Sequence, residues 1–516
     1  MSNKKISVVN VIMLVMCMNI FVKIFSFTRD FLLGKIVGVG FEMDAYLTSL
    51  SITTRFFLAF GAAIVTTMVP IIVKEKDELK RKEKLTDINT FVFFLGLLIT
   101  IIYLVFTPQI ISGYVSGFSE EKLLLTTTLT RILIPSIFFI LYTNFFVGIM
   151  QCNQRYLIAT SISIPYNILI ILYISLAKDF NIYFLTFVTL LGWFGQMCVV
   201  MPSVIKMKSF KIKLNSFYNE NFKVFLKSFT LVFIVVATIQ LLNITNNKFL
   251  SYFDDGIVST YFYGNMIYNT IVSLIVYAIT VVMFPKFNES FLKDKGKFFF
   301  FVERVLSIVI ILLIPICGGM FLVGDQMMMI LFLGESYPME SVLITAKFMI
   351  IFSVASVGFG FNEVLNKAYY SADDKFTPIK TTLIIIATNF ILNYFFIRIL
   401  ELNHYYVVVA TVMSYYLGIA FSLYVFPFEE KKQFAKGLLT TFVKSMVSVI
   451  IMYIVVYGLQ VLLFPNPFDL SMTNRVVYIF MSVIIGVPIY FLICFILKEK
   501  IVYDTIKLIR NRKGEK

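Results

Sequence analysis

The sequence predicts an all-α polytopic membrane protein with about fourteen transmembrane helices, and three observations support that prediction. Of the 516 residues, 59% are hydrophobic, and the mean hydropathy is +0.87. Soluble domains are about half apolar. Apolar runs of roughly 20 residues, which suffice to cross a bilayer as a helix, recur along the chain. Finally, Lys and Arg gather in alternate connections between these runs, and no hydrophilic block is long enough for a separate catalytic domain.

The apolar runs give the expected spans in order. They lie near residues 7–33, 44–73, 88–111, 123–150, 156–177, 183–205, 224–247, 257–284, 299–323, 339–367, 379–400, 405–426, 438–463 and 476–497. The connections after spans 2, 6, 8 and 12 and the C-terminal tail are basic: residues 74–84 hold six Lys or Arg residues, and the tail from Lys498 onward holds seven. The opposite connections are poor in them, since 324–338 holds none. The positive-inside rule therefore predicts that both termini are cytoplasmic, and it accounts for most of the net charge of +15.

An internal repeat divides the predicted spans. Pro70 closes span 2 and lies 81 residues before Gln151, and Pro285 closes span 8 and lies 81 residues before Asn366. The pattern predicts two six-helix lobes of the same orientation, with a substrate site between them as in transporters built from parallel repeats. The predicted divisions are an N-terminal lobe at 1–215 (spans 1–6), a C-terminal lobe at 216–430 (spans 7–12), and spans 13–14 with a basic cytoplasmic tail at 431–516.

Ionisable residues at membrane depth are the strongest functional signal. An ionisable group in a bilayer costs at least a few kcal/mol, so it usually faces a polar interior and marks a pathway. Residues 23–70 carry Lys23, Arg29, Asp30, Asp44 and Arg55. Some of these charges have a structural alternative, because Arg29, Asp30 and Lys35 can extend to the interface from a helix end. Lys23 and Asp30 can also neutralise each other, since they lie seven apart on one helix face.

Further candidates for a polar cavity are Arg131 in lobe 1 and Lys347 and Glu363 in lobe 2. The cations of lobe 1 favour an anionic cargo, because an Arg fork matches phosphate oxygens. We find no catalytic motif and no phosphate-binding GxxxxGK[ST] loop, so the sequence does not predict an enzyme. The single His404 and the five scattered cysteines predict no metal site and no disulfide framework.

The stretch KIFSFTRDFLLGKIVGVGFEMDAYLTS resembles the opening signature of the MurJ (MviN) lipid II flippases, of the multidrug/oligosaccharidyl-lipid/polysaccharide exporter superfamily. In that family the first span reads approximately R-x-x-G-F-x-R-D, then G-x-G, then D-A-[FY]. Further similar stretches follow in the family's order and extend the likeness over spans 1–12. They are LTRILIPSIFF, GIMQCNQRY, GWFGQMCVVMPSVIK, DDGIVSTYFYGNMIYN, VVMFPKF, ILFLGESY and LNKAYYSADDKFTP.

This resemblance implies a transporter and not an enzyme: an alternating-access flippase that moves undecaprenyl-pyrophosphate-linked peptidoglycan precursor across the bacterial cytoplasmic membrane. Its role would be in cell-wall synthesis and cell shape. The implied partners are the lipid-linked precursor, membrane lipids and the cell-wall synthesis machinery, with no nucleic acid, and the implied state is a monomer. No cofactor is implied, and the driving force would be Na⁺ or the membrane potential.

The resemblance also assigns site residues. The family's cationic cavity carries over to Lys23, where the family usually has Arg, to Arg29 and Asp44, and to Arg55 with a small alignment gap. Asn265 stands where the family has a cavity arginine on the eighth span. A candidate cation site falls on Asn243, Asn389 and Asn393, where some members carry carboxylates on spans 7 and 11.

Three alternatives remain open from the residues. The first is a flippase for another polyprenyl-linked polysaccharide repeat unit, which would share the fold and the cationic cavity. The second is a cation-coupled small-molecule antiporter, which would need a surplus of buried acids that lobe 1 lacks. The third is a structural scaffold, which gains nothing from the desolvation of buried charges.

Overall fold

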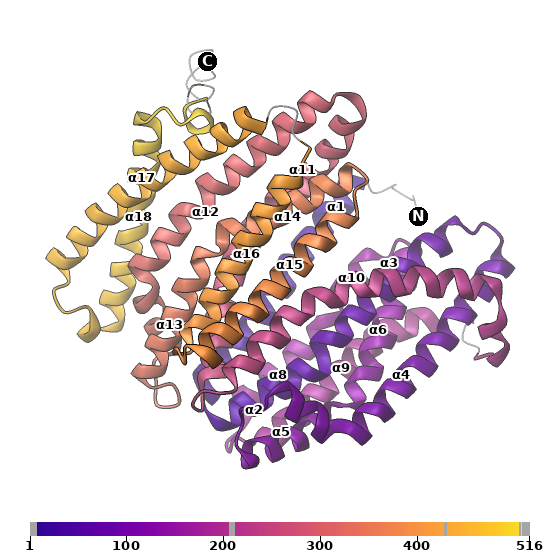
Figure 1. Cartoon of the computed structure of the whole chain (residues 1–516). Coiled ribbons are helices and arrows are strands. Elements are labelled where there is room, and N and C mark those ends of the chain that lie inside the picture. The colour runs from indigo at the N-terminus through magenta and orange to yellow at the C-terminus, as the bar shows by residue number, and fades with distance from the viewer. Residues whose placement is uncertain (1–7, 206–211, 428–430, 505–506, 508–516) are drawn as a thin grey trace, which may run out of the picture. The chain divides into compact units, whose positions relative to one another are not determined.

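The computed structural model describes residues 8–205, 212–427, 431–504 and 507. It consists mainly of helices (Figure 1). Within these ranges every regular element is a helix, apart from one isolated bridge between Gly334 and Tyr337. Twelve helices of the described ranges are long and apolar enough to cross a membrane, or thirteen if the bent pair α13 and α14 is one span. The prediction of an all-α polytopic membrane protein is confirmed, and the count of fourteen spans stays a prediction.

The chain forms two compact units, Met1–Ser259 and Thr260–Lys516. The helices of the first unit are α1 (Val8–Leu32), α2 (Phe41–Leu50), α3 (Phe56–Lys74), α4 (Glu78–Tyr114), α5 (Glu120–Leu133), α6 (Pro135–Cys152), α7 (Tyr156–Thr160), α8 (Ile164–Leu176), α9 (Ile182–Ile205) and α10 (Glu220–Leu250). Short 3₁₀ segments occupy Ser161–Ser163 and Leu214–Tyr218, and π-helical turns occupy Leu33–Val37 and Ser51–Arg55.

The first unit packs around α3, which contacts both α6 and α10. Gly61 of α3 lets α6 approach closely, since a Cβ there would lie 2.4 Å from the Asn144 side chain. On the other side, α10 presents aromatic rings to α3 and α4: the Phe233 ring lies 3.9 Å from that of Phe60, and the Phe229 ring lies 5.1 Å from that of Phe91. This aromatic packing places α10 in the first unit.

The boundary between compact units therefore differs from the boundary that the sequence repeat predicts. The repeat divides the chain at 215/216 and assigns span 7 to the second lobe, whereas span 7 is α10 and packs on α3 and α4. Packing and repeat membership are separate properties, because a helix that belongs to one repeat by sequence can pack its aromatic face on helices of the other repeat. The division at 1–215, 216–430 and 431–516 stays a prediction about the repeat.

The helices of the second unit follow from α11 (Ile257–Lys293), which begins just before the boundary. They are α12 (Lys295–Phe332), α13 (Met339–Val354), α14 (Ser356–Ser371), α15 (Phe376–Asn393), α16 (Tyr405–Val425), α17 (Lys431–Leu463) and α18 (Met472–Ile496), with a π-helical stretch at Tyr394–Ile399 and a 3₁₀ turn at Pro467–Asp469. The α13–α14 pair bends by 44° at Ala355.

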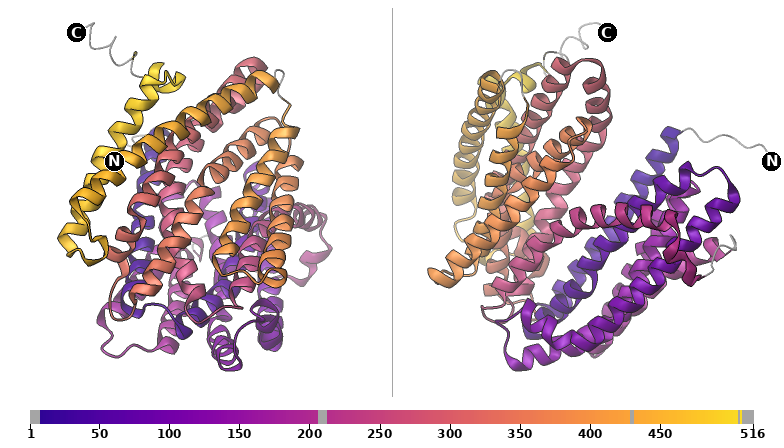
Figure 2. Two further views of the ribbon diagram at one scale, coloured as in Figure 1. Left: turned by 60° about the vertical axis from the view of Figure 1, so that its left-hand side comes forward. Right: turned by 45° about the vertical axis from the view of Figure 1, so that its right-hand side comes forward.

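Within the second unit, α12 contacts α13, α14, α17 and α18. Figures 1 and 2 show α17 and α18 as adjacent ribbons beside α12. The buried Arg475 of α18 fixes their connection, because it donates to Gln326 Oε1 of α12 at 2.8 Å and to the Phe468 carbonyl at 2.7 Å. Gln326 in turn donates to the Pro467 carbonyl at 2.7 Å. Spans 13 and 14 are thus held to α12 by polar contacts as well as by packing.

Several helices begin where the sequence supplies a cap. Asp77 accepts from the Leu79 amide at 2.8 Å, and Asp294 accepts from the Lys297 amide at 3.1 Å. The connection before α4 also holds an ion pair, with Lys84 Nζ 2.6 Å from Glu75 Oε2. The hydrogen bond from Lys84 lowers the pKa of the Glu75 carboxyl below its ordinary value.

Candidate functional site

The second span is one continuous helix with a π-helical turn in its middle. Helices α2 and α3 are joined by Ser51–Arg55, and the whole span runs from Phe41 to Lys74. A π-turn loosens the backbone ladder, and it often marks a functional position. Here the Thr53 and Thr54 hydroxyls donate back to the Ser49 and Leu50 carbonyls, at 2.7 and 2.5 Å. The turn ends at Arg55 and so sets the position of that side chain.

Arg55 lines a pocket of about 150 Å³ inside the first unit. The pocket lies between the π-turn, α4 and α10, and its polar lining comes from Ser51, Arg55, Tyr103, Tyr114, Gln240 and Asn243. Among the described residues no carboxylate lies within 4.0 Å of the Arg55 guanidinium. Since water occupies about 30 Å³ per molecule in the liquid, the pocket has room for a phosphate-sized group.

A hydrogen-bond network fixes one wall of this pocket. The Tyr114 hydroxyl of α4 lies 3.0 Å from Ser51 Oγ, and Asn247 Nδ2 of α10 donates to Tyr114 at 2.8 Å and to Ser51 at 3.3 Å. The three groups join the π-turn to α4 and α10. The wall therefore consists of neutral donors and acceptors, and Arg55 supplies the positive charge.

A second polar cluster centres on Arg29 of α1. Arg29 forms a salt bridge with Asp30 at 2.7 Å, donates to Asn167 Oδ1 of α8 at 2.9 Å, and lies 4.9 Å from the centre of the Tyr166 ring. Asn167 Nδ2 donates onward to Ser26 Oγ at 3.1 Å. The Asp30 carboxylate also interacts electrostatically with Arg55, which links the cluster to the pocket. Arg29 is thus a charge with a fixed position and a partner.

The third polar group surrounds Asp44 of α2, whose side chain is fully buried. Lys122 Nζ, 2% exposed, lies 2.7 Å from Asp44 Oδ2 and 2.8 Å from Asp255 Oδ1. The Gly256 and Ser259 amides each donate to Asp44 at 2.8 Å. Gly256 has φ of +92°, which favours glycine and turns its amide toward the carboxylate. These bonds join α2, α5 and the start of α11.

A family model described as lipid II flippase MurJ matches residues 33–479 of this chain. The chain belongs to that family. A probable lipid II flippase MurJ of Buchnera aphidicola subsp. Acyrthosiphon pisum (strain APS) is 24% identical over 390 residues, which cover 74% of this chain and 76% of the relative. The lipid II flippase MurJ of Thermosipho africanus (strain TCF52B) is 24% identical over 446 residues, which cover 85% and 88%.

Solved structures agree on the fold. A lipid II flippase MurJ in an inward closed conformation matches with a TM-score of 0.81 at 22% identity, covering 95% of this chain and all of that one. An inward-facing multidrug transporter of the MATE family, from the MOP superfamily, matches with a TM-score of 0.61 at 14% identity, covering 82% and 99%. The resemblance to the MurJ family is therefore confirmed, and the protein is a membrane transporter and not an enzyme. The likeness to the MATE transporter shows a shared fold.

The structure brings some of the predicted MurJ-type cavity residues together and separates others. Arg29 and Arg55 both interact with Asp30, whereas Asp44 lies in the buried group with Lys122. In this structure the Asp44 side chain has no exposed surface for a ligand to contact. Lys23 is exposed on α1. The assignment of these residues to substrate binding stays a prediction.

The further candidates occupy different surroundings. Arg131 is exposed in the last turn of α5, and Lys347 is exposed on α13, 5.6 Å from the centre of the Tyr405 ring. Glu363 is partly buried on α14 and interacts electrostatically with Lys367. Asn265 of α11 accepts from Asn269 Nδ2 at 2.6 Å.

The three residues of the candidate cation site fall in two units. Asn243 lines the Arg55 pocket of the first unit, and a guanidinium beside it disfavours a second cation there. Asn389 and Asn393 are fully buried on α15 of the second unit. Asn389 Nδ2 donates to Thr411 Oγ1 of α16 at 3.1 Å, and Asn393 Nδ2 donates to the Asn389 carbonyl at 2.9 Å. Asn389 Oδ1 is buried and accepts no hydrogen bond from the described residues.

Reasoning from the sequence missed the partners of the predicted charges. Lys122 contacts Asp44, Asn167 contacts Arg29, and Asp255 pairs with Lys122, but none of these three residues was among the candidates. Lys122 is the one basic residue in the connection 112–122, and Asn167 is an amide in an otherwise apolar span. These were the available signals, but neither indicates which distant charge the residue meets.

Proposed function

We propose that this protein flips lipid II from the inner to the outer leaflet of the bacterial cytoplasmic membrane by alternating access. Membership of the MurJ family supports the cargo and the fold class. The observation that carries the proposal within the molecule is the Arg55 pocket, where a cation with no carboxylate within 4.0 Å among the described residues faces a phosphate-sized space. A pyrophosphate-linked lipid is a cargo that such a pocket suits.

The geometry gives the two arginines different roles in this proposal. The Arg55 guanidinium would bind pyrophosphate oxygens directly, because its fork of donors matches their spacing. Arg29 already donates to Asp30 and Asn167, so it would hold Asp30 in place and balance its charge. The Ser51, Tyr114 and Asn247 network would keep its wall of the pocket fixed while cargo enters. Precise placement reduces the entropy cost of binding.

Complementation of a strain with a conditional lipid II flippase tests this function. We expect the full chain to restore growth and normal cell shape when the resident flippase is depleted. A chain carrying Arg55→Ala serves as the matched negative control at equal membrane abundance. Growth failure with the wild-type chain, despite normal insertion, would favour a flippase for another polyprenyl-linked repeat unit. Restoration of only that other polymer would overturn the lipid II assignment.

For the topology, we propose that both termini are cytoplasmic, on the support of the Lys and Arg asymmetry. Reporter fusions after residues 118, 330 and 505 test it. The fusions after 118 and 330 should report the outer side, and the fusion after 505 should report the cytoplasm. An outer signal after 505 together with a cytoplasmic signal after 118 would contradict the proposal.

For the driving force, we propose that Na⁺ binds in the second unit at the Asn389 and Thr411 oxygens. The support is that Asn389 Oδ1 is buried and accepts no hydrogen bond from the part of the chain that the structure describes, because hard cations prefer oxygen ligands. Na⁺ should raise the midpoint of thermal unfolding relative to K⁺ at equal ionic strength, and Asn389→Val should remove that difference. An equal effect of both salts on the wild type would leave the membrane potential as the driving force, worth about 2.3 kcal/mol per charge per 100 mV.

We also propose that the protein works as a monomer beside the cell-wall synthesis machinery, and the resemblance to the MurJ family is the support for this.

A further inference from the structure

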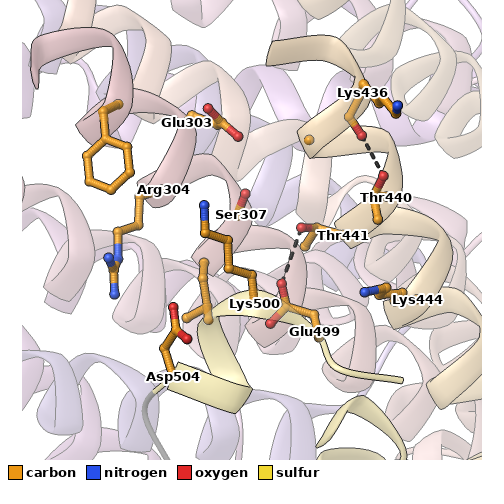
Figure 3. Close-up of a pocket in the computed structure, with 13 residues that line it drawn as sticks. Glu303, Arg304, Ser307, Lys436, Thr440, Thr441, Lys444, Glu499, Lys500 and Asp504 are labelled. Carbon is orange, nitrogen blue, oxygen red and sulfur yellow. Dashed lines mark hydrogen bonds between the residues drawn. The ribbon is translucent and has the colours of Figure 1, made fainter. Parts of the chain in front are cut away.

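A charged pocket of about 410 Å³ lies in the second unit, and none of its lining residues has a role assigned above. It is bounded by the beginnings of α12 and α17 and by residues 499–504, which follow α18 (Figure 3). The lining supplies the cations Arg304, Lys436, Lys444 and Lys500 and the carboxylates Glu303, Glu499 and Asp504. The pocket therefore sits at the ends of membrane spans, where lipid headgroups lie.

The carboxylates are partly committed to the protein itself. Glu499 is 1% exposed, and it accepts from the Val502 amide at 2.9 Å and from the Thr441 hydroxyl at 3.3 Å. Figure 3 shows the Glu499–Thr441 bond across the pocket. Glu303 interacts electrostatically with Lys500. Lys444 donates to the Lys498 carbonyl at 2.9 Å, so Arg304 and Lys436 are the two lining cations whose charged groups have no polar contact with the rest of the described chain.

No ion pair within 4.0 Å joins Arg304 or Lys436 to a carboxylate in the described part of the chain. Arg304 lies 6.0 Å from the centre of the Phe300 ring, and Lys436 is exposed. Together the lining has four cations against three carboxylates, so the pocket carries a net positive charge. The Ser307 hydroxyl adds a neutral donor to the lining, whereas the Thr440 hydroxyl donates to the Lys436 carbonyl at 2.7 Å (Figure 3).

An apolar stripe continues the pocket along α17. Lys436 and Thr440 are followed on the same helix face, at spacings of three and four, by Val443, Val447, Ile450 and Ile454. All four of these side chains are exposed, from 39% at Val447 to 63% at Ile454. In a membrane helix such a face meets acyl chains. Charged and polar residues thus come first along this face, and apolar residues follow. A ligand with a charged head and apolar chains has the same arrangement.

We propose that this pocket binds the phosphodiester headgroup of an anionic membrane phospholipid, with its acyl chains along the exposed stripe of α17. The headgroup would lie between Arg304 and Lys436, which Figure 3 shows on opposite sides of the pocket, and the Ser307 hydroxyl would donate to it. Basic pockets between transmembrane helices at the membrane surface are suited to such headgroups. This lipid would stay bound to the protein and would not be the transported cargo.

Binding of defined lipids to the full-length, delipidated protein tests this proposal. Phosphatidylglycerol, phosphatidylethanolamine and inorganic phosphate would each be titrated while lipid retention is measured by native mass spectrometry and the midpoint of unfolding is followed. Phosphatidylglycerol should bind the wild type and raise its midpoint. Its affinity should fall at least about tenfold in Arg304→Gln/Lys436→Gln, since each cation near a membrane surface contributes on the order of 1 kcal/mol.

The matched control is Lys293→Gln/Lys297→Gln, which removes two exposed cations outside the pocket. It should bind phosphatidylglycerol as the wild type does. Equal losses in both double variants would overturn the pocket, since general charge would then explain binding. Inorganic phosphate that protects as well as phosphatidylglycerol would overturn the lipid as ligand, and equal retention of phosphatidylethanolamine would overturn its anionic character. If the pocket variant fails to fold, Lys436→Gln alone carries the same comparison.

Discussion

Replacing Arg55 with Ala should abolish lipid II transport while the protein still folds and inserts. Arg55 faces a pocket of about 150 Å³ and has no carboxylate within 4.0 Å among the described residues, so its removal strands no close ionic partner. Water can fill the space that the side chain leaves. A charge-assisted hydrogen bond contributes about 1.5–3 kcal/mol, so head-group affinity should fall on the order of ten- to a hundredfold.

The measurement is lipid II flipping in proteoliposomes, normalised to protein inserted. Arg55→Lys should keep part of the activity, because the charge remains while the planar fork is lost. Lys178→Ala, which removes an exposed cation from the connection between α8 and α9, is the matched control and should transport normally. Normal flipping by Arg55→Ala would contradict the assigned role, and loss of the folded protein would show that Arg55 is structural.

Arg29→Ala provides an informative contrast with Arg55→Ala. Its removal would leave the partly buried Asp30 carboxylate without its 2.7 Å partner and Asn167 without a donor. An unpaired buried charge is costly, so we expect this variant to lose stability as well as transport. The resemblance assigned both arginines to one cationic cavity, and the structure separates them by their partners.

The spans were predictable because bilayer thickness imposes a length on each apolar run. Predicted span 2 at 44–73 corresponds to Phe41–Lys74, and predicted span 12 at 405–426 corresponds to Tyr405–Val425. Hydropathy missed the features that depend on packing or on water. Helix α4 begins at Glu78, ten residues before the predicted span, because a helix keeps its own hydrogen bonds beyond the apolar region. The bend at Ala355 contains no proline, so the sequence pattern did not predict it.

The site was predictable to a different extent. The desolvation cost of charge singled out Arg29, Asp30, Asp44 and Arg55, and the structure gives each of them polar surroundings. Their partners were not predictable, since Arg29 and Asn167 are 138 residues apart and no local periodicity relates them. The π-turn that ends at Arg55 was also missed, because a run of Ser and Thr residues fits an ordinary helix equally well.

Replacing Asp44 with Ala should destabilise the first unit more than any surface charge change. The substitution would leave the Lys122 ammonium, 2% exposed, without its buried partner, and would remove the acceptor of the Gly256 and Ser259 amides. Breaking a buried ion pair from one side costs about 3–5 kcal/mol. We therefore expect a clear fall in the midpoint of thermal unfolding of the purified protein in detergent.

Asp255→Asn is the matched control, because Asp255 contacts the same ammonium but is 57% exposed. Its loss should cost about 1 kcal/mol or less, since water screens exposed pairs.

Adding Lys122→Met to Asp44→Asn should restore part of the stability lost in Asp44→Asn alone, because the double variant removes both buried charges. Equal effects of Asp44→Asn and Asp255→Asn would show that burial does not set the strength of this pair. Strict additivity in the double variant would show that the two buried charges do not depend on each other.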